Sequence, residues 1–324
     1  MSPLEAIGVD LGGTKMLVGV LDSASEVAWE SRERSTGQSE EQLIDLLARE
    51  VEEAREARPG VAAVGLGIPA TIDHERGVAV SAVNLPIENM PIRGVAGERI
   101  GLPIFVDNDA NVAALAEHLY GAARGADNAV MLTIGTGIGG GLILNGEVYR
   151  GATGAAAELG HTVIAMDGLP CQGNCPGHGC VETYASGTAL GREARAAAER
   201  EPDSALGALL AQGHEVDGKA VTEAALAGDP TSVGVFELVG TRLGVALASF
   251  ANIFEPEVIV IGGGVIAAGD LLLDPAREEL RRRALPPMNG TPVRPAELGE
   301  DAGMIGAAAM ARIELDAVGG GGGS

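Results

Sequence analysis

The sequence has little positive charge. Its 324 residues carry 22 Lys and Arg side chains against 45 Asp and Glu, so the formal net charge is −23 at pH 7. A field of that sign repels the phosphates of nucleic acids and the anionic headgroups of membranes. We therefore expect neither nucleic acid nor a membrane surface as a partner. Any ATP site must supply its own local anion-binding groups.

The sequence also lacks the segments that direct a chain out of the cytoplasm. Its first residues, MSPLEAIGVD, contain no basic region followed by an apolar run, and no uninterrupted apolar stretch approaches 18 residues. These absences argue against a signal peptide and a transmembrane helix. We expect a cytoplasmic protein. Residues 318–324 have the composition of a flexible tail or linker and are left out of the fold prediction.

Cysteine is scarce and confined to one segment. Cys171, Cys175 and Cys180 lie within ten positions of one another. An odd, tightly grouped set in a chain without a signal peptide is typical of a metal site rather than of disulfides. Together with His161 these residues form a four-ligand set for a closed, structural zinc site. His178 lies in the same loop and is an alternative fourth ligand.

Glycine, in contrast, is abundant, with 49 residues, and a glycine turn lies within each of two similar strand–turn–strand units. Residues 6–21 have apolar runs on either side of a turn and predict a β-hairpin. Residues 129–144 repeat the pattern, with 135–141 expected as turn and 142–144 as the returning strand. The repetition predicts a duplicated α/β architecture, one unit per lobe. Apolar patterns predict further strands at 61–68, 104–106 and 258–261, and helices at 40–58, 109–120, 185–200, 233–252 and 304–315.

The length suggests two lobes. We expect residues 1–115 to form the first lobe and residues 116–302 the second lobe, which includes the zinc loop. The last helix, within 303–317, is expected to pack back on the first lobe.

The turn of the first hairpin has features of a phosphate-binding loop. Two glycines, Gly12 and Gly13, let backbone N–H groups approach phosphate oxygens without obstruction by side chains. Asp10 at the strand end could hold hydrated Mg²⁺, and the Thr14 hydroxyl could donate to a phosphate; Lys15 completes this candidate nucleotide-binding set. A tight hairpin without a ligand is the alternative explanation.

Two later glycine segments extend the nucleotide-binding prediction. Gly135, Thr136 and Gly137 form a second turn, and a pair of such turns could clamp a triphosphate between the lobes. A dinucleotide fingerprint is a weak alternative, because a strand rather than a helix is expected to follow. Gly262, Gly263 and Gly264 follow a strand and would let adenine lie on the backbone, although close helix–strand packing explains them equally well.

A polar segment, Asp107-Asn-Asp-Ala-Asn111, stands at the end of a predicted strand. A carboxylate there suits the orientation and deprotonation of a hydroxyl nucleophile in phosphoryl transfer. The alternative is that Asn108, Asp109 and Asn111 are helix caps. The helix N-terminus is expected to keep Asp109 ionised at neutral pH.

Jointly these motifs resemble the ROK family of sugar kinases and repressors, and within it the bacterial glucokinases. The similarity runs from about residue 7 to residue 309. The matching segments are 8–15, 108–111, 134–142 with Gly151, 160–161, 175–187 and 261–264.

The resemblance implies an α/β fold of the actin-like ATPase (ribonuclease H-like) type, with two lobes around a central ligand cleft. It implies transfer of the γ-phosphoryl group of ATP, with Mg²⁺, to the 6-hydroxyl of glucose, with Asp109 as the general base. His161 would give one ring nitrogen to zinc and the other to the sugar. Family members are usually dimers or tetramers. The implied sugar ligands are Asn84, Asn108, Asp109, Glu158, His161 and Glu182.

The sequence departs from the family pattern at several positions. Three residues separate Cys171 from Cys175, where one is common, so Cys171 is the least certain zinc ligand. Ala157 and Ala70 stand where many relatives carry glycine.

Three alternatives stay open at this point. The substrate could be fructose, mannose or N-acetylmannosamine, because epimers differ only in the direction of one hydroxyl. Polyphosphate could replace ATP as the donor. A sugar-sensing repressor would carry a DNA-binding domain before the first glycine turn, and only nine residues precede Asp10.

Overall fold

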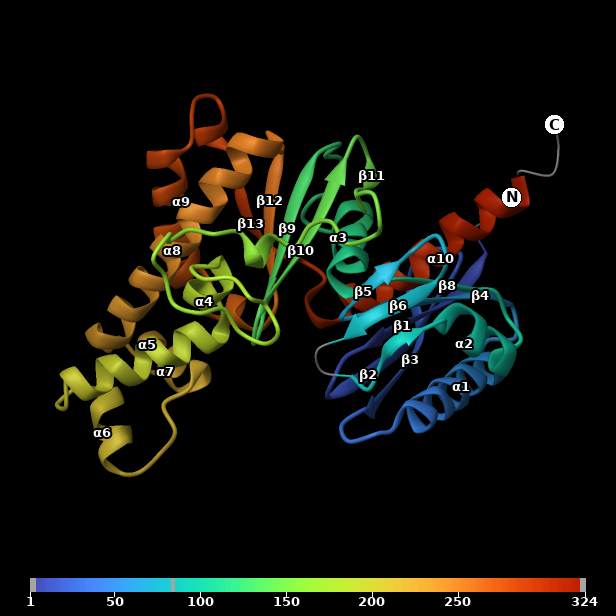
Figure 1. Cartoon of the computed structure of the whole chain (residues 1–324), viewed down its shortest axis with the longest axis horizontal. Coiled ribbons are helices and arrows are strands. Elements are labelled where there is room, and N and C mark those ends of the chain that lie inside the picture. Colours follow the sequence, from blue (N-terminus) through green and yellow to red (C-terminus); the bar gives the residue numbers. More distant parts are fainter. Residues whose placement is uncertain (1–3, 83–84, 321–324) are drawn as a thin grey trace.

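The computed structural model describes residues 4–82 and 85–320, and two five-stranded sheets dominate it (Figure 1). The first has the order β3-β2-β1-β4-β8 and the second β11-β10-β9-β12-β13. In both, three consecutive antiparallel strands are followed by two strands that run parallel to the first one. The matching order confirms the predicted duplication and the α/β class.

The strands are short, and most of them follow one another in groups between the helices. The first sheet consists of β1 (Glu5–Leu11), β2 (Lys15–Leu21), β3 (Val27–Arg34), β4 (Val61–Ile68) and β8 (Ile104–Asn108). The second consists of β9 (Ala129–Ile134), β10 (Ile138–Leu144), β11 (Glu147–Val148), β12 (Val258–Gly262) and β13 (Val293–Pro295). A third, smaller sheet contains β5 (Ala70–Asp73), β6 (Val78–Ala82) and β7 (Glu88–Met90).

Helices cover the sheets and build most of the second lobe. The first lobe contains α1 (Glu40–Ala57) and α2 (Ile92–Ile100), and α3 (Asp109–Tyr120) follows β8. The second lobe contains α4 (Val181–Ala185), α5 (Gly187–Arg200), α6 (Ala205–Ala211), α7 (Gly218–Leu226), α8 (Pro230–Phe254) and α9 (Asp270–Arg283). The last helix is α10 (Ala302–Gly320).

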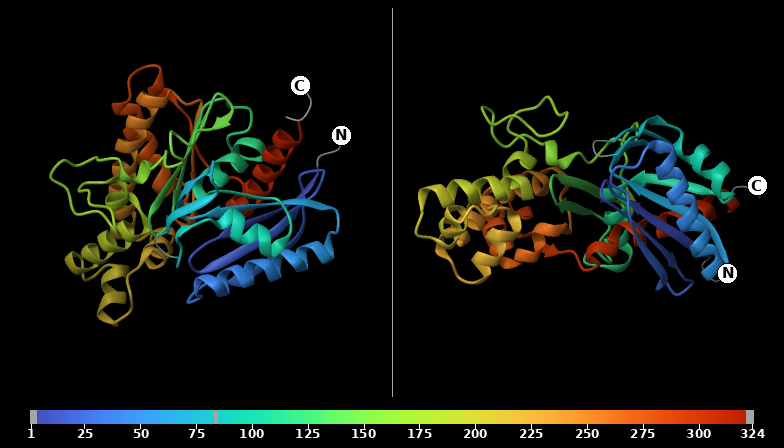
Figure 2. Two further views of the ribbon diagram at one scale, coloured as in Figure 1. Left: turned by 45° about the vertical axis from the view of Figure 1, so that its right-hand side comes forward. Right: turned by 90° about the horizontal axis from the view of Figure 1, so that it is seen from below.

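Helix α10 lies directly on the first sheet (Figure 2). A Cβ atom on Gly8 of β1 would lie 1.9 Å from the Met304 carbonyl oxygen, and one on Gly65 of β4 would lie 1.8 Å from that of Ala307. Because these positions have no side chain, the helix backbone reaches the sheet. Alanine side chains from α3 and α10 fill the layer between the two large sheets.

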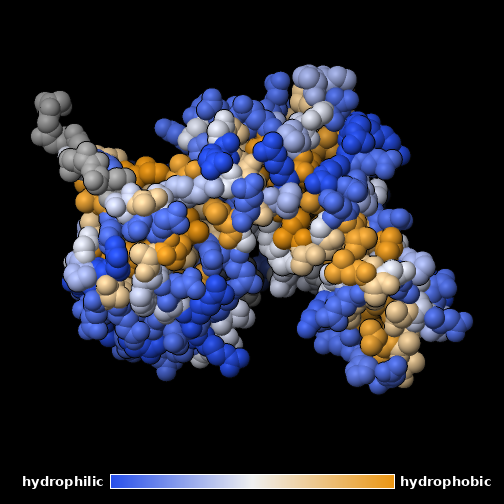
Figure 3. Space-filling model, turned by 180° about the vertical axis from the view of Figure 1, so that it is seen from behind, coloured by the Kyte–Doolittle hydropathy of each residue, from blue (hydrophilic) through white to orange (hydrophobic). Residues whose placement is uncertain are grey.

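Helix α8 is long and apolar enough to cross a membrane by length and composition, with a mean hydropathy of 1.5 in its best window. Such a helix is weak evidence for a membrane span, because the core helix of a soluble protein passes the same test. Here Phe236, Leu243 and Phe250 are buried in the core of the second lobe. The space-filling view shows hydrophilic residues interspersed with hydrophobic ones on this face and a hollow between the lobes (Figure 3).

Two expected elements differ from the structure. Strand β10 begins at Ile138 rather than at residue 142, because Gly139, Gly140 and Gly141 pair with β9 instead of forming a turn. The helix expected at 185–200 is α5, which begins at Gly187, and a separate short helix, α4, precedes it. Ser186 separates them, and its hydroxyl accepts a hydrogen bond from the Ala189 N–H at 3.2 Å.

Candidate active site and metal-binding loop

The ends of parallel strands place the first glycine turn beside Asp109. Strands β1, β4 and β8 run in parallel, so Asp10 near the end of β1 and Asp109 after β8 lie at the same edge of the sheet. Ligands of open α/β sheets bind at this carboxyl edge.

Hydrogen bonds hold the first glycine turn from inside the lobe. The Gly12 N–H donates to the Lys15 carbonyl at 2.9 Å, and the Ser35 hydroxyl donates to the Gly12 carbonyl at 2.6 Å. The Lys15 ammonium, one of the predicted phosphate ligands, pairs with Glu300 at 2.7 Å and is half-exposed. In this structure its charge is therefore directed to a neighbouring carboxylate. Gly13 and Thr14 lie at the accessible tip of the turn.

The Asp10 carboxyl lies in an environment that favours its protonated form. Burial, followed by the nearby charge of Asp109, raises its pKa to about 7, and Lys15 partly opposes the shift. Its Oδ2 would lie 2.7 Å from a Cβ atom on Gly303, near the start of α10. A cation bound here would relieve the repulsion between the two carboxyl groups.

Asp109 is the first residue of α3. Burial raises the pKa of its carboxyl, the backbone N–H groups of Ala110 and Asp109 lower it, and the charge of Glu158 raises it again. The net direction is upward, so burial outweighs the stabilisation of the ionised form by the helix N-terminus. That Asp109 is ionised at neutral pH stays a prediction. A raised pKa suits a general base, which is most effective when its pKa lies near the working pH.

The Asn108 side chain is the N-cap of α3. Its Oδ1 accepts hydrogen bonds from the N–H groups of Ala110 and Asn111 at 2.9 and 3.3 Å, while its Nδ2 donates to the Ala70 carbonyl at 3.3 Å. The amide nitrogen has one further hydrogen to donate. The capping role is therefore observed, and a sugar contact by the same residue stays a prediction. Asn84, another predicted sugar ligand, lies outside the described residues.

The second glycine turn borders a cavity of about 600 Å³. Neither Gly135 nor Gly137 lies in the left-handed region, and a Cβ atom on Gly135 would meet nothing within 4 Å. The backbone geometry alone does not require glycine at position 135, so its absent side chain keeps the cavity wall open. The turn is fixed behind by a hydrogen bond from the Gly187 N–H to the Gly135 carbonyl at 2.8 Å.

The three glycines at the end of β12 and after it differ in why each position is glycine. Gly264 lines the same cavity, and a Cβ atom on it would meet, within the described part of the chain, no atom closer than 4 Å beyond its own chain neighbours. Gly263 has a φ of +86°, and its Cβ would lie 2.4 Å from the Ile134 carbonyl oxygen, so it is required by packing. Gly262 lies within the strand.

Sequence reasoning missed much of this cavity. The N-terminal turns of α5 and α7 form one wall, and α7 was not predicted at all. The helix signal was present, because Asp217 caps α7 by accepting from the Ala220 N–H at 2.8 Å. The cavity residues that were not predicted are Gly187, Thr188, Leu190, Gly218, Lys219, Thr222, Glu223, Val265 and Ala267.

Glu182 links the second turn to the cysteine loop. Its Oε2 accepts from the Ile138 N–H at 2.8 Å, and a Cβ atom on Gly137 would lie 2.2 Å from that oxygen. Its Oε1 lies 4.0 Å from Cys171 Sγ. The side chain thus supports the second glycine turn, and its sugar contact stays a prediction.

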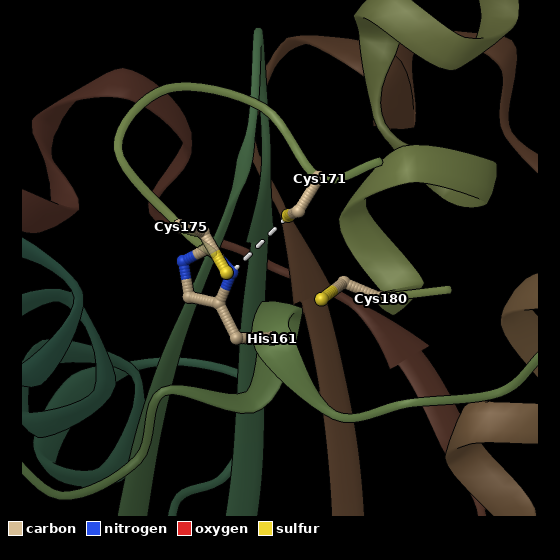
Figure 4. A group of neighbouring side chains, drawn as sticks. All are labelled: His161, Cys171, Cys175 and Cys180. Atoms are coloured by element: carbon tan, nitrogen blue, oxygen red, sulfur yellow. Dashed lines mark hydrogen bonds between the residues drawn. The ribbon is translucent and has the colours of Figure 1, made fainter. Parts of the chain in front are cut away.

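The three cysteines and His161 come together as the sequence predicts (Figure 4). One ligand atom from each lies within 4.8 Å of the others, and Cys171 Sγ is 3.5 Å from His161 Nδ1. A tetrahedral zinc ion with bonds of about 2.3 Å to sulfur and 2.0 Å to nitrogen would separate these two atoms by about 3.5 Å. The donor set and spacing therefore fit zinc.

The surroundings of the cluster also fit a metal-bound thiolate site. The Gly177 N–H donates to Cys175 Sγ at 3.4 Å. Burial and the two neighbouring thiols raise the pKa of Cys180 to about 12, a penalty that a cation would remove. His178 lies outside the group, with its Nδ1 3.3 Å from the Gly168 carbonyl oxygen.

His161 faces two ways. Its Nδ1 is directed to the sulfur cluster, and its Nε2 lies 3.9 Å from Glu158 Oε2. Glu158 is in turn close enough to Asp109 to raise the pKa of that carboxyl. Glu158 thus lies near both His161 of the metal-binding group and the candidate base Asp109.

Comparisons with known proteins agree with this geometry. A family model described as "ROK family" matches residues 6–314. Curated glucokinases of Streptomyces coelicolor and Halalkalibacterium halodurans are 38% and 37% identical; the match covers 94% of this chain and 97% and 94% of those proteins. The crystal structure of a ROK family glucokinase from Streptomyces griseus in complex with glucose and AMPPNP superposes with a TM-score of 0.84. It is 38% identical, with coverage of 95% of this chain and 99% of that one. The chain belongs to the ROK family and has its actin-like ATPase fold.

Proposed function

We propose that this protein is a glucokinase that transfers the γ-phosphoryl group of ATP to the 6-hydroxyl of glucose. The observation that carries the proposal is the position of Asp109. Its carboxyl interacts with Asp10 of the first glycine turn and with Glu158 of the segment that leads to His161. The candidate base thus lies between a phosphate-binding turn and polar groups that suit sugar hydroxyls. The similarity to named glucokinases over most of the chain supports the same function.

The proposed reaction needs one base and two sets of hydrogen-bond donors. Asp109 accepts the proton of the 6-hydroxyl while the hydroxyl oxygen forms a bond to the γ-phosphorus. The bond from that phosphorus to the β–γ bridging oxygen breaks, and ADP leaves. Backbone N–H groups of the glycine turns would stabilise the charge on the phosphoryl oxygens.

ATP is assigned to the cavity between the second glycine turn, α5 and α7. The cavity offers open glycine backbone at Gly135 and Gly264 and the side chain of Lys219. Asp10 is the carboxylate that would hold Mg²⁺, which would supply charge neutralisation at the phosphates. Polyphosphate as donor is a second outcome that the assay below distinguishes.

Zinc is assigned to His161, Cys171, Cys175 and Cys180. All four positions are occupied by protein ligands, so the ion would be structural. It would fix the His161 ring so that Nε2 is presented beside Glu158. Elemental analysis should find about one zinc per chain, and a Cys171→Ser variant should retain less zinc after dialysis against a chelator. A full zinc content in that variant would remove Cys171 from the ligand set.

The proposal also specifies which hexose is the preferred substrate, namely glucose. Glu158, His161 and Glu182 are the proposed sugar ligands, together with Asn108 and Asn84. Cytoplasmic location, self-association as a dimer or tetramer, and the absence of nucleic-acid and membrane partners belong to the same proposal.

The decisive experiment is a coupled assay of ADP release with a panel of hexoses. We expect glucose to give the highest kcat/KM, ahead of mannose, fructose and N-acetylmannosamine, and a parallel assay with polyphosphate tests the donor. Asp109→Asn should lower kcat by at least about 100-fold with unchanged folding. The matched control is Asp203→Asn, at an exposed position of the second lobe. The absence of hexose-dependent ADP release from the wild type would refute the proposal.

A further inference from the structure

A buried carboxyl group stands two residues before the candidate base. Asp107, near the end of β8, is 1% exposed. Its Oδ1 accepts hydrogen bonds from the Asn108 N–H at 2.7 Å and from Asn111 Nδ2 at 2.9 Å. These bonds tie Asp107 to both sides of Asp109, so a displacement of Asp107 would displace the start of α3.

The second carboxyl oxygen of Asp107 binds Arg150, which follows the edge strand of the second large sheet. Arg150 follows β11, and its Nε donates to Asp107 Oδ2 at 2.6 Å. The guanidinium is 24% exposed and also lies 3.8 Å from Glu314 of α10. A charge-assisted bond of this length to a buried acceptor is strong and directional.

The segment from Arg150 to Glu158 touches the first lobe at a second point. Gly154 has a φ of +86°, and a Cβ atom there would lie 2.0 Å from the Ile72 carbonyl oxygen of β5. The backbone therefore rests directly on the small sheet. The same segment ends at Glu158, a proposed sugar ligand, and His161.

A further side chain, His74, lies beside the ion pair. His74 of the first lobe lies with Nδ1 3.0 Å from the Val106 carbonyl oxygen and Nε2 3.1 Å from Glu314 Oε1. Its Nδ1 is also 3.9 Å from Asp107 Oδ2. Arg150 is thus inserted among groups from β8, the small sheet and α10.

We propose that Arg150 is a positioning residue for phosphoryl transfer, which sets the sugar-binding segment 151–158 against the base Asp109 through its ion pair with Asp107. The inference rests on the proposed function. Neither Arg150 nor Asp107 touches the substrate in this role. Arg150 holds one end of the sugar-binding segment, and Asp107 holds the strand end that carries the base.

The planar guanidinium explains why arginine is suited to this position. Its Nε binds Asp107 while its Nη2 faces Glu314. One rigid guanidinium group therefore interacts with two carboxylates from different elements. A lysine would keep the charge but not this fork. Arg150→Lys should therefore restore part of what Arg150→Met removes.

The kinetic test compares the two substrates separately. With Arg150→Met we expect kcat/KM for glucose to fall by about 100-fold, the scale of a misplaced reacting group, while KM for Mg·ATP stays within about twofold. Asp107→Asn should give a similar loss, and the double variant should be no worse than the more impaired single variant, because the two residues act as a unit. The control is Arg277→Met, a comparably buried arginine that pairs with Asp270 and Asp274 in α9 and should leave both substrates unaffected.

A second measurement separates this inference from the proposed function. In ligand-free protein, amide hydrogen exchange in residues 151–158 should be about tenfold faster in Arg150→Met than in wild type, with exchange in α8 unchanged. Unchanged exchange, losses that multiply in the double variant, or a glucose kcat/KM within about threefold of wild type would each overturn the positioning role. Faster exchange in the variant, together with a wild type that has no hexose kinase activity, would instead overturn the proposed function alone.

Discussion

Glu117 provides the most direct test of how the lobes are joined. The side chain belongs to α3 and is fully buried. Its Oε2 accepts from the N–H groups of Ala122 and Glu297 at 2.8 and 3.2 Å, and its Oε1 accepts from the Leu298 N–H at 2.9 Å. The Ala122 segment leads from α3 to β9, and the segment at 297–298 leads from β13 back to α10. One carboxyl group therefore holds both connections between the lobes.

The Glu117→Gln substitution keeps the shape and removes one acceptor. In its better orientation the amide nitrogen faces Leu298, so one buried N–H loses its partner, at about 1–3 kcal/mol. The two remaining bonds weaken from charged to neutral acceptors, by about 1 kcal/mol each. Easier burial of a neutral amide offsets part of this loss. We expect a net decrease of about 2 kcal/mol in the free energy of unfolding.

The assay is urea unfolding of the ligand-free protein at pH 7.5, followed by circular dichroism. Glu117→Leu leaves all three N–H groups without a partner, so its loss should exceed that of Glu117→Gln. Glu199→Gln is the control, because Glu199 is 58% exposed and, among the residues that the structure describes, pairs with Arg195 alone on the surface of α5. It should change stability by less than about 0.5 kcal/mol. A Gln variant as stable as wild type, or a Leu variant more stable than Gln, would refute the reasoning.

Three other substitutions test the packing, the backbone and the electrostatics of the site. Gly65→Ala places a Cβ 1.8 Å from the Ala307 carbonyl oxygen and should destabilise by about 3 kcal/mol or more in urea unfolding, whereas Gly94→Ala, with nothing within 4 Å, should not. Ala157→Gly should stabilise by about 0.5–1 kcal/mol, because Ala157 has a φ of +64°; lower stability would show that this backbone is not strained. For Asp10, the folded pKa of about 7 exceeds the unfolded value of 3.8, so the folded chain holds a proton that the unfolded chain has lost. The contribution of Asp10 to the stability of the ligand-free protein should therefore fall between pH 4 and pH 7, and Asp10→Asn should remove this contribution from the slope of stability against pH; equal slopes in the two proteins would contradict the shift.

Apolar runs made most of the sheet framework predictable. Strands such as β4 and β12 consist almost entirely of buried aliphatic residues, and the chain repeats the hairpin pattern in both halves. Strand β10 was placed wrongly because its glycines suggest a turn. In the structure Gly141 pairs in the sheet, and its Cβ would lie 2.5 Å from the Ala114 side chain of α3. Close packing, rather than a turn, requires glycine there, and no local pattern distinguishes the two causes.

The chemistry of the site was more predictable than its contacts. The four zinc-type ligands are close in sequence, so their residue types were sufficient to group them. Lys15 shows the limit, because its partner Glu300 lies 285 positions away and nothing near Lys15 signals the pairing. Arg150 was missed for the same reason. The division of the chain at residue 115 into two lobes stays a prediction.

The abundance of glycine takes on a different meaning once each position is placed. Gly8 and Gly65 are required because α10 touches the sheet, and Gly263 because its backbone is left-handed against Ile134. None of these positions indicates a ligand. Gly135 and Gly264 differ, since both have open space at the Cβ position and both line the same cavity. A glycine in such a motif therefore supports nucleotide binding only where neither close packing nor a positive φ explains the glycine. Among the glycines of the predicted motifs after β9 and β12, only Gly135 and Gly264 meet this condition, and both line the proposed ATP cavity.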